Sequence, residues 1–167
     1  MEQTSAIPGW SDFFVATAGV AGALAGLLFV AISINIAKII ELPSAINRAG
    51  EGLLMLAGVL AVALVALVPA QSAHHLGMIL LAAAIPAWFL PILTQIRGFR
   101  HHHYQHKLHV PLRATLHQIG TLPIVVGALG LFGEIAGVGI GWVAAGCILS
   151  MVVAMFSAWV LLIEILR

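Results

Sequence analysis

The sequence predicts an all-helical integral membrane protein, a bundle of five transmembrane helices. Of its 167 residues, 62% are hydrophobic and only 8% are charged, whereas a soluble globular domain carries roughly 25% charged residues. Long apolar stretches recur along the whole chain, and most approach the roughly 20 residues that cross a hydrocarbon core about 30 Å thick. None of them alternates polar and apolar residues with a period of two, so a β-barrel is not expected.

The same composition excludes other classes of protein. The seven basic and six acidic side chains are too few to cover the surface of a soluble domain of this size. A nucleic-acid-binding domain would show a surplus of basic residues, but the net charge is only +1. Membrane lipids are therefore the expected surroundings, and no nucleic-acid partner is expected.

The first predicted span covers residues 13–40 and is interrupted only by Ser33, Asn35 and Lys38 near its end. The second span covers residues 53–68, and Pro69 closes it because proline disrupts the interior of a helix. Turn-forming residues such as Pro43 and Gly50 separate the two spans.

Three further spans are expected, at residues 76–96, 114–132 and 140–166. A polar segment, residues 97–113, separates the third span from the fourth. Glycines between residues 133 and 141 mark the last break, because clustered glycines loosen a helix. This break and the short turn after the second span are the weakest, so a bundle of four spans is the alternative. In both cases residues 1–167 form a single transmembrane domain.

The basic residues predict the orientation, since Lys and Arg concentrate in short cytoplasmic loops. With five spans, all seven basic residues fall on one side of the membrane. They lie between residues 38 and 48, in the segment 97–113 and at the C-terminus. We therefore expect the N-terminus outside, the C-terminus in the cytoplasm, and residues 97–113 as a cytoplasmic loop. The N-terminus lacks the basic region of a cleavable signal peptide, so the first span is expected to be retained.

Small residues repeat at helical spacing in the first and last spans. In lipid, such residues let helix backbones approach closely. The stripe can pack within one subunit; alternatively, one stripe packs internally and the other contacts a second copy in a homo-oligomer or larger complex. The predicted packing residues are Gly19, Gly22, Gly26, Gly146, Ser150 and Ala154.

Polar residues inside membrane spans are costly and are functional candidates. Here they gather at the predicted cytoplasmic ends of the spans. We expect a hydrated inner vestibule lined by Ser33, Asn35, Gln95, His117 and Glu164. The alternative is that the basic side chains of the same layer reach the lipid headgroups and pair with Glu164 or Glu41; these are Lys38, Arg97 and Arg167. The outer half is poor in polar groups, so a pore would need a hydrophobic constriction that gates by dewetting.

Five of the eight histidines lie between residues 101 and 109. If this segment is helical, His102, His106 and His109 share one face. Neutral imidazoles so placed can bind a divalent transition metal such as zinc, nickel or copper. No cysteine or carboxylate in the loop completes a selective site, so a solvated loop against lipid headgroups is the alternative. No other cofactor is expected.

No catalytic motif is present: the sequence lacks a Walker sequence, HExxH, GxSxG and a pair of intramembrane carboxylates. We therefore expect no enzyme and no catalytic residues. The small residues of the first span, followed by residues 27–35, resemble the first helices of many small bacterial membrane proteins, a likeness that covers one helix only. With the number of spans, we expect a multi-pass protein of the inner (cytoplasmic) membrane. The predicted function is a homo-oligomeric pore or a small ion or solute transport assembly. The alternative is a non-catalytic accessory or regulatory subunit of a larger membrane complex.

Overall fold

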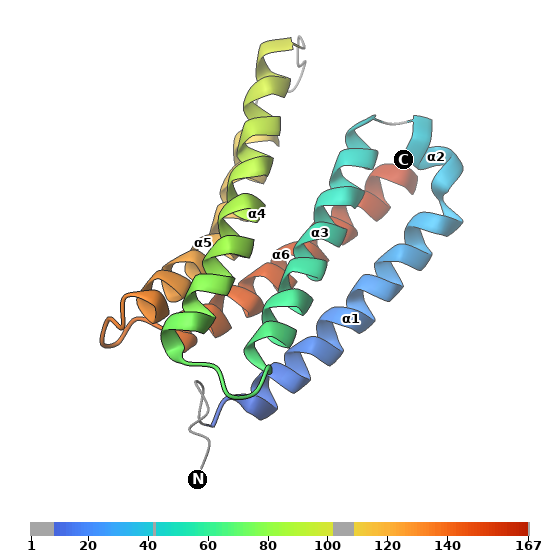
Figure 1. Cartoon of the computed structure of the whole chain (residues 1–167). Helices are drawn as coiled ribbons and strands as arrows, with labels where there is room; N and C mark the ends of the chain where they lie inside the picture. The colour runs from blue at the N-terminus through green and yellow to red at the C-terminus, as the bar shows by residue number, and fades with distance from the viewer. Residues whose placement is uncertain (1–8, 42, 102–108, 167) are drawn as a thin grey trace. The chain divides into compact units, whose positions relative to one another are not determined.

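A computed structural model of the chain describes residues 9–41, 43–101 and 109–166, and helices make up nearly all of them (Figure 1). No strand occurs in these residues, so the all-helical prediction is confirmed. The helices are α1 (Ser11–Ile34), α2 (Ile36–Glu41), α3 (Pro43–Ala66), α4 (Ala73–His101), α5 (His109–Phe132) and α6 (Ile140–Leu166).

Four helical stretches among the described residues are long and apolar enough to cross a membrane. They are Ser11–Ile34, Arg48–Ala66, Thr115–Phe132 and Ile140–Ile163. These lengths indicate a multi-pass membrane protein. The apolar helical stretch Ala73–Phe89 of α4 is shorter than these four, so a fifth span through α4 stays a prediction, as does the orientation of the termini.

The first predicted span is divided at Asn35. The Asn35 side-chain nitrogen Nδ2 donates to the carbonyl oxygen of Ala31 at 2.9 Å, and the Asn35 backbone nitrogen lies 3.3 Å from the same oxygen. The side chain thus competes for the acceptor that would continue the helix. Asn35 leaves helical geometry at φ −104° and ψ 14°, and α2 begins at the next residue.

The other boundaries follow the turn chemistry of the sequence. The helix predicted to begin at residue 53 begins at Pro43 instead, because proline suits the first turn of a helix, where its missing N–H costs nothing. The predicted glycine-rich break lies where expected: α5 ends at Phe132 and α6 begins at Ile140. Beyond α5, Glu134 and Gly137 adopt positive φ angles of 52° and 79°.

The helices form two compact units. The hairpin unit comprises residues 69–149, with α4, α5 and the first part of α6. The N-terminal unit comprises residues 9–68 with α1, α2 and α3, together with α6 from Ser150 onward.

Glycines let the helices of the hairpin unit touch through their backbones. A methyl group on Gly77 of α4 would lie 2.3 Å from the backbone nitrogen of Phe132 in α5. One on Gly127 of α5 would lie 2.6 Å from the backbone nitrogen of Val143 in α6. Only the hydrogen atom of a glycine fits at these two positions. The glycines therefore determine how closely the helices pack.

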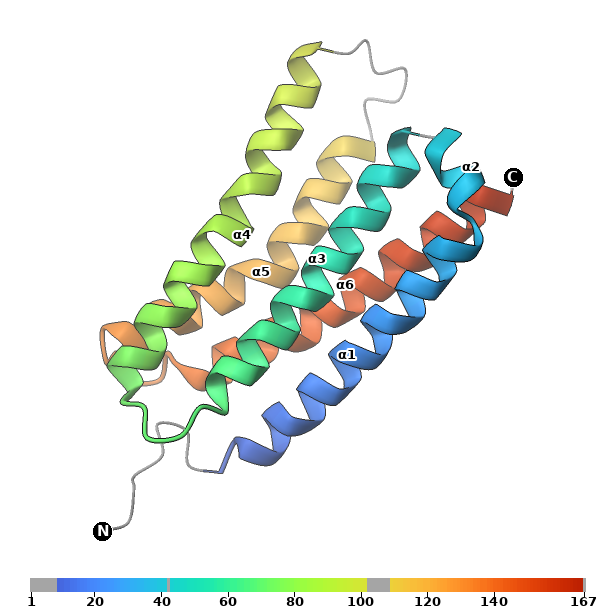
Figure 2. The same cartoon turned by 45° about the vertical axis from the view of Figure 1, so that its right-hand side comes forward.

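In the N-terminal unit, α1 packs along α3 (Figure 2). The buried residues of α1 are Phe14, Thr17, Ala21 and Leu28. Their spacing of three, four and seven residues places them on one face of the helix. Beyond the break at Asn35, α2 packs on the start of α3 and the end of α6, where Ile39, Ala45, Ala49 and Leu161 form a buried cluster.

Candidate functional site

The face of α1 opposite its contact with α3 is open. It carries exposed residues at alternating spacings of three and four, which is the heptad spacing of about 3.5 residues. These residues are Ala16, Gly19, Ala23, Gly26, Val30 and Ser33. Only 17% of the residues of α1 are buried, against 33% to 44% in the other three candidate spans. We call this set the α1 small-residue face.

The predicted packing glycines of the first span make no close contact within the described chain. A methyl group on Gly19, Gly22 or Gly26 would have no described atom within 4 Å beyond its own stretch of helix. The packing residues of α6 behave differently. A methyl group on Gly146 would lie 2.4 Å from a side-chain carbon of Ile124, and Ser150 and Ala154 are 2% and 1% exposed. One stripe is therefore internal and the other is open.

Two of the predicted vestibule residues lie at the end of α1. The Ser33 hydroxyl donates to the Phe29 carbonyl oxygen at 2.8 Å, and the Asn35 carboxamide donates to Ala31 as described above. Both side chains therefore turn back onto the helix. Each bond uses one donor only, so the Ser33 oxygen and the Asn35 carboxamide oxygen can still accept hydrogen bonds.

Polar side chains also meet between α4 and α5 in the hairpin unit. The Trp88 indole Nε1 donates to the Gln118 side-chain oxygen Oε1. Next to Gln118, His117 is only 8% exposed, and the Thr121 hydroxyl donates to the His117 carbonyl oxygen at 2.9 Å. The sequence marks His117, but it gives no signal for the bond from Trp88, because such a pairing depends on how two helices are rotated against each other.

The Trp88–Gln118 bond is expected to stabilise the hairpin unit modestly. In a double-mutant cycle of Trp88→Phe and Gln118→Leu, we expect a coupling energy of about 0.6 kcal/mol and no more than about 1.7 kcal/mol, the range for hydrogen bonds between membrane helices. Thermal unfolding of the purified single and double variants in detergent measures it. Strictly additive effects would contradict a direct bond. Phe89→Leu, at an exposed neighbouring position, is the control.

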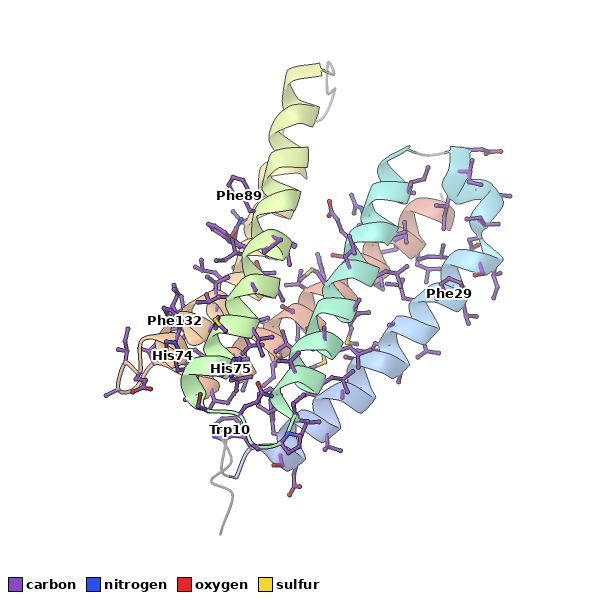
Figure 3. All side chains as sticks on the ribbon, viewed as in Figure 1. Trp10, Phe29, His74, His75, Phe89 and Phe132 are labelled. Atoms are coloured by element: carbon purple, nitrogen blue, oxygen red, sulfur yellow. The ribbon has the colours of Figure 1, made fainter. Side chains whose placement is uncertain are left out.

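His74 joins the start of α4 to the end of α5, as Figure 3 shows. Its ring nitrogen Nδ1 lies 2.8 Å from the Phe132 carbonyl oxygen, and its ring stacks on that of Phe132 with centroids 4.5 Å apart. Since a carbonyl oxygen only accepts, Nδ1 carries the proton. The Ser72 hydroxyl oxygen accepts from the His75 backbone nitrogen at 3.2 Å, which caps the first turn of α4. We interpret His74 as a structural residue, because its ring joins the two helices.

The remaining predicted site residues lie partly outside the described part of the chain. Gln95 is in α4 and Glu164 in α6, but their side chains are outside it, as is that of His109 at the start of α5. His102 and His106 lie outside it altogether. Among the described residues, no group of three or more His, Cys, Asp and Glu could hold a metal ion. Ser33 and Asn35 belong to the N-terminal unit and His117 to the hairpin unit, so their common vestibule stays a prediction.

Comparisons of this chain with protein-family models, with curated proteins and with solved structures give no match.

Proposed function

We propose that this chain forms a homo-oligomer in the bacterial inner membrane that conducts an ion or a small solute. The observation that supports the proposal best is the α1 small-residue face, which is open and lies opposite the contact with α3. In lipid, helices associate through close packing of small residues. A second copy of α1 can approach this face closely, because a methyl group on Gly19 or Gly26 would meet no described atom within 4 Å beyond its own stretch of helix.

The same face supplies a candidate polar ring. Ser33 is the next heptad position after Val30, and both are exposed. Association through this face would bring the Ser33 hydroxyls of several copies around one axis, with the apolar residues of the face forming the constriction beside them. Hydrophobic constrictions of this kind gate by dewetting. Of the predicted vestibule residues, Ser33 is the member that lies on this face.

Reconstitution tests the proposal directly. Purified protein in gentle detergent is expected to migrate as a single oligomer, and the same protein in liposomes should pass ions above the level of empty liposomes. Ser33→Leu, which adds apolar bulk to the ring, should reduce the flux at least about tenfold while the oligomer stays intact. Ile34→Leu, at a neighbouring exposed position outside the face, should conduct normally.

A folded oligomer without flux across a range of voltage and pH would contradict the proposal. That result would favour the other predicted role, a non-catalytic accessory subunit whose open α1 face contacts a different chain.

The proposed orientation has the N-terminus outside and the C-terminus in the cytoplasm. It rests on the positions of the basic residues and can be tested by labelling. In a background without Cys147, single cysteines at positions 72 and 136 should react with a membrane-impermeant reagent added from outside. A cysteine at position 104 should be protected until the membrane is opened. Labelling of position 104 in intact cells would reverse the proposed topology.

A further inference from the structure

The N-terminal unit contains a pocket of about 310 Å³ lined by residues of α1, α2, α3 and the second part of α6. Its walls are almost entirely apolar, and its polar side chains are those of Asn35 and Trp159. Leu27, Met155 and Trp159 line it and are 69%, 54% and 58% exposed. The pocket is therefore a groove open at the surface of the unit. We call it the Asn35 groove.

The length of the groove matches one leaflet of a bilayer. Along α1 and its C-terminal cap, the lining runs from Leu24 to Asn35, which is about 16 Å at a rise of about 1.5 Å per residue. Half of a hydrocarbon core of about 30 Å is about 15 Å. Leu24 lies near the middle of α1 (Ser11–Ile34), so the groove covers the half of the span that ends in the polar residues.

The chemistry of the groove changes along its length. Leu24, Leu28 and Ala31 make its inner part apolar. At Asn35, one carboxamide N–H donates to Ala31, which leaves its second N–H and its oxygen available. Trp159, whose indole N–H can donate, also lines the groove. Beyond them, exposed Lys38 follows in α2.

We propose that the Asn35 groove binds one acyl chain of a phospholipid. The chain lies along the apolar part, the ester carbonyl accepts hydrogen bonds from the carboxamide of Asn35 and the indole of Trp159, and the phosphate lies toward Lys38. This order of apolar, donor and cationic groups is the order of chain, ester and phosphate in the lipid. Basic groups at the ends of membrane helices attract anionic headgroups, so phosphatidylglycerol is expected to bind more tightly than phosphatidylcholine.

Quenching of Trp159 fluorescence by phosphatidylglycerol with brominated chains tests this site. The lipid is titrated at low mole fraction into the purified full chain in detergent, and the contribution of Trp159 is the difference from Trp159→Phe. We expect saturable quenching that unbrominated phosphatidylglycerol reverses. The apparent affinity for phosphatidylcholine should be at least about threefold lower. Asn35→Leu should weaken the apparent affinity about threefold or more.

A matched pair of variants separates the groove from the rest of the surface. Ala158→Phe fills the groove, because Ala158 lines it, and should abolish the saturable component. Ala61→Phe makes the same change at an exposed position of α3 outside the lining and should retain it. Both variants are first checked for helix content by circular dichroism, and Ala31→Leu replaces Ala158→Phe if the latter misfolds.

Quenching that rises in proportion to mole fraction, equally in both variants, would overturn the proposal and show bulk lipid contact only. Saturable quenching that appears only when the oligomer is dissociated would also overturn it, since a second copy would then occupy the groove. Neither measurement depends on ion flux, so the lipid site and the proposed pore can be confirmed or contradicted independently.

Discussion

Gly77→Ala is expected to lower the stability of the protein by about 3 kcal/mol, the upper end of the usual cost of overpacking. The added methyl group would lie 2.3 Å from the Phe132 backbone nitrogen and 2.9 Å from the Ala128 carbonyl oxygen. These are backbone atoms of α5, so no side chain can rotate away to make room. The two helices must separate, and the bond from His74 to Phe132 is lost with the contact.

Thermal unfolding in detergent, followed by circular dichroism, measures this effect. Gly58→Ala in α3 is the matched control, because a methyl group there would have no described atom within 4 Å beyond its own stretch of helix. It should raise stability by up to about 1 kcal/mol, since alanine is the better helix former. An unfolding temperature for Gly77→Ala equal to that of the unchanged protein would show that α4 and α5 are not in backbone contact.

The sequence predicts the helical class and most of the breaks because these depend on local composition. The break between α5 and α6 lies where its glycines predict it. The division at Asn35 is missed, since counting apolar residues does not register a side chain that competes for a backbone acceptor. Gly77 and Gly127 are not predicted as packing residues for another reason: their partners are on other helices, whereas a repeat of small residues is a pattern within one helix.

The same limit applies to the candidate sites. The sequence alone identifies Ser33, Asn35 and His117 as candidates, because they are polar residues in apolar spans. Which of these residues share a surface depends on helix rotation and on buried area. The heptad spacing on α1 is legible in the sequence, yet only the burial pattern shows that its small residues are open and that those of α6 are internal.

Gly26→Leu is expected to dissociate the oligomer while leaving the protomer folded. Gly26 is exposed and a methyl group there would meet no described atom within 4 Å, so the larger side chain costs little inside one chain. Between two copies it would hold the α1 backbones apart and remove the close contacts that drive association in lipid. We expect the apparent dissociation constant to rise at least about tenfold, or about 1.4 kcal/mol.

Energy transfer between separately labelled copies in liposomes, measured against lipid dilution, gives that constant, and circular dichroism checks the fold. Val20→Leu enlarges an exposed residue of α1 outside the small-residue face and should leave association unchanged, as should Leu27→Ile. If the open face is a contact between copies of this chain, the loss of energy transfer in Gly26→Leu must be accompanied by loss of ion flux. Equal energy transfer in all three variants would mean that the face contacts lipid, and the pore would then have to form through another helix.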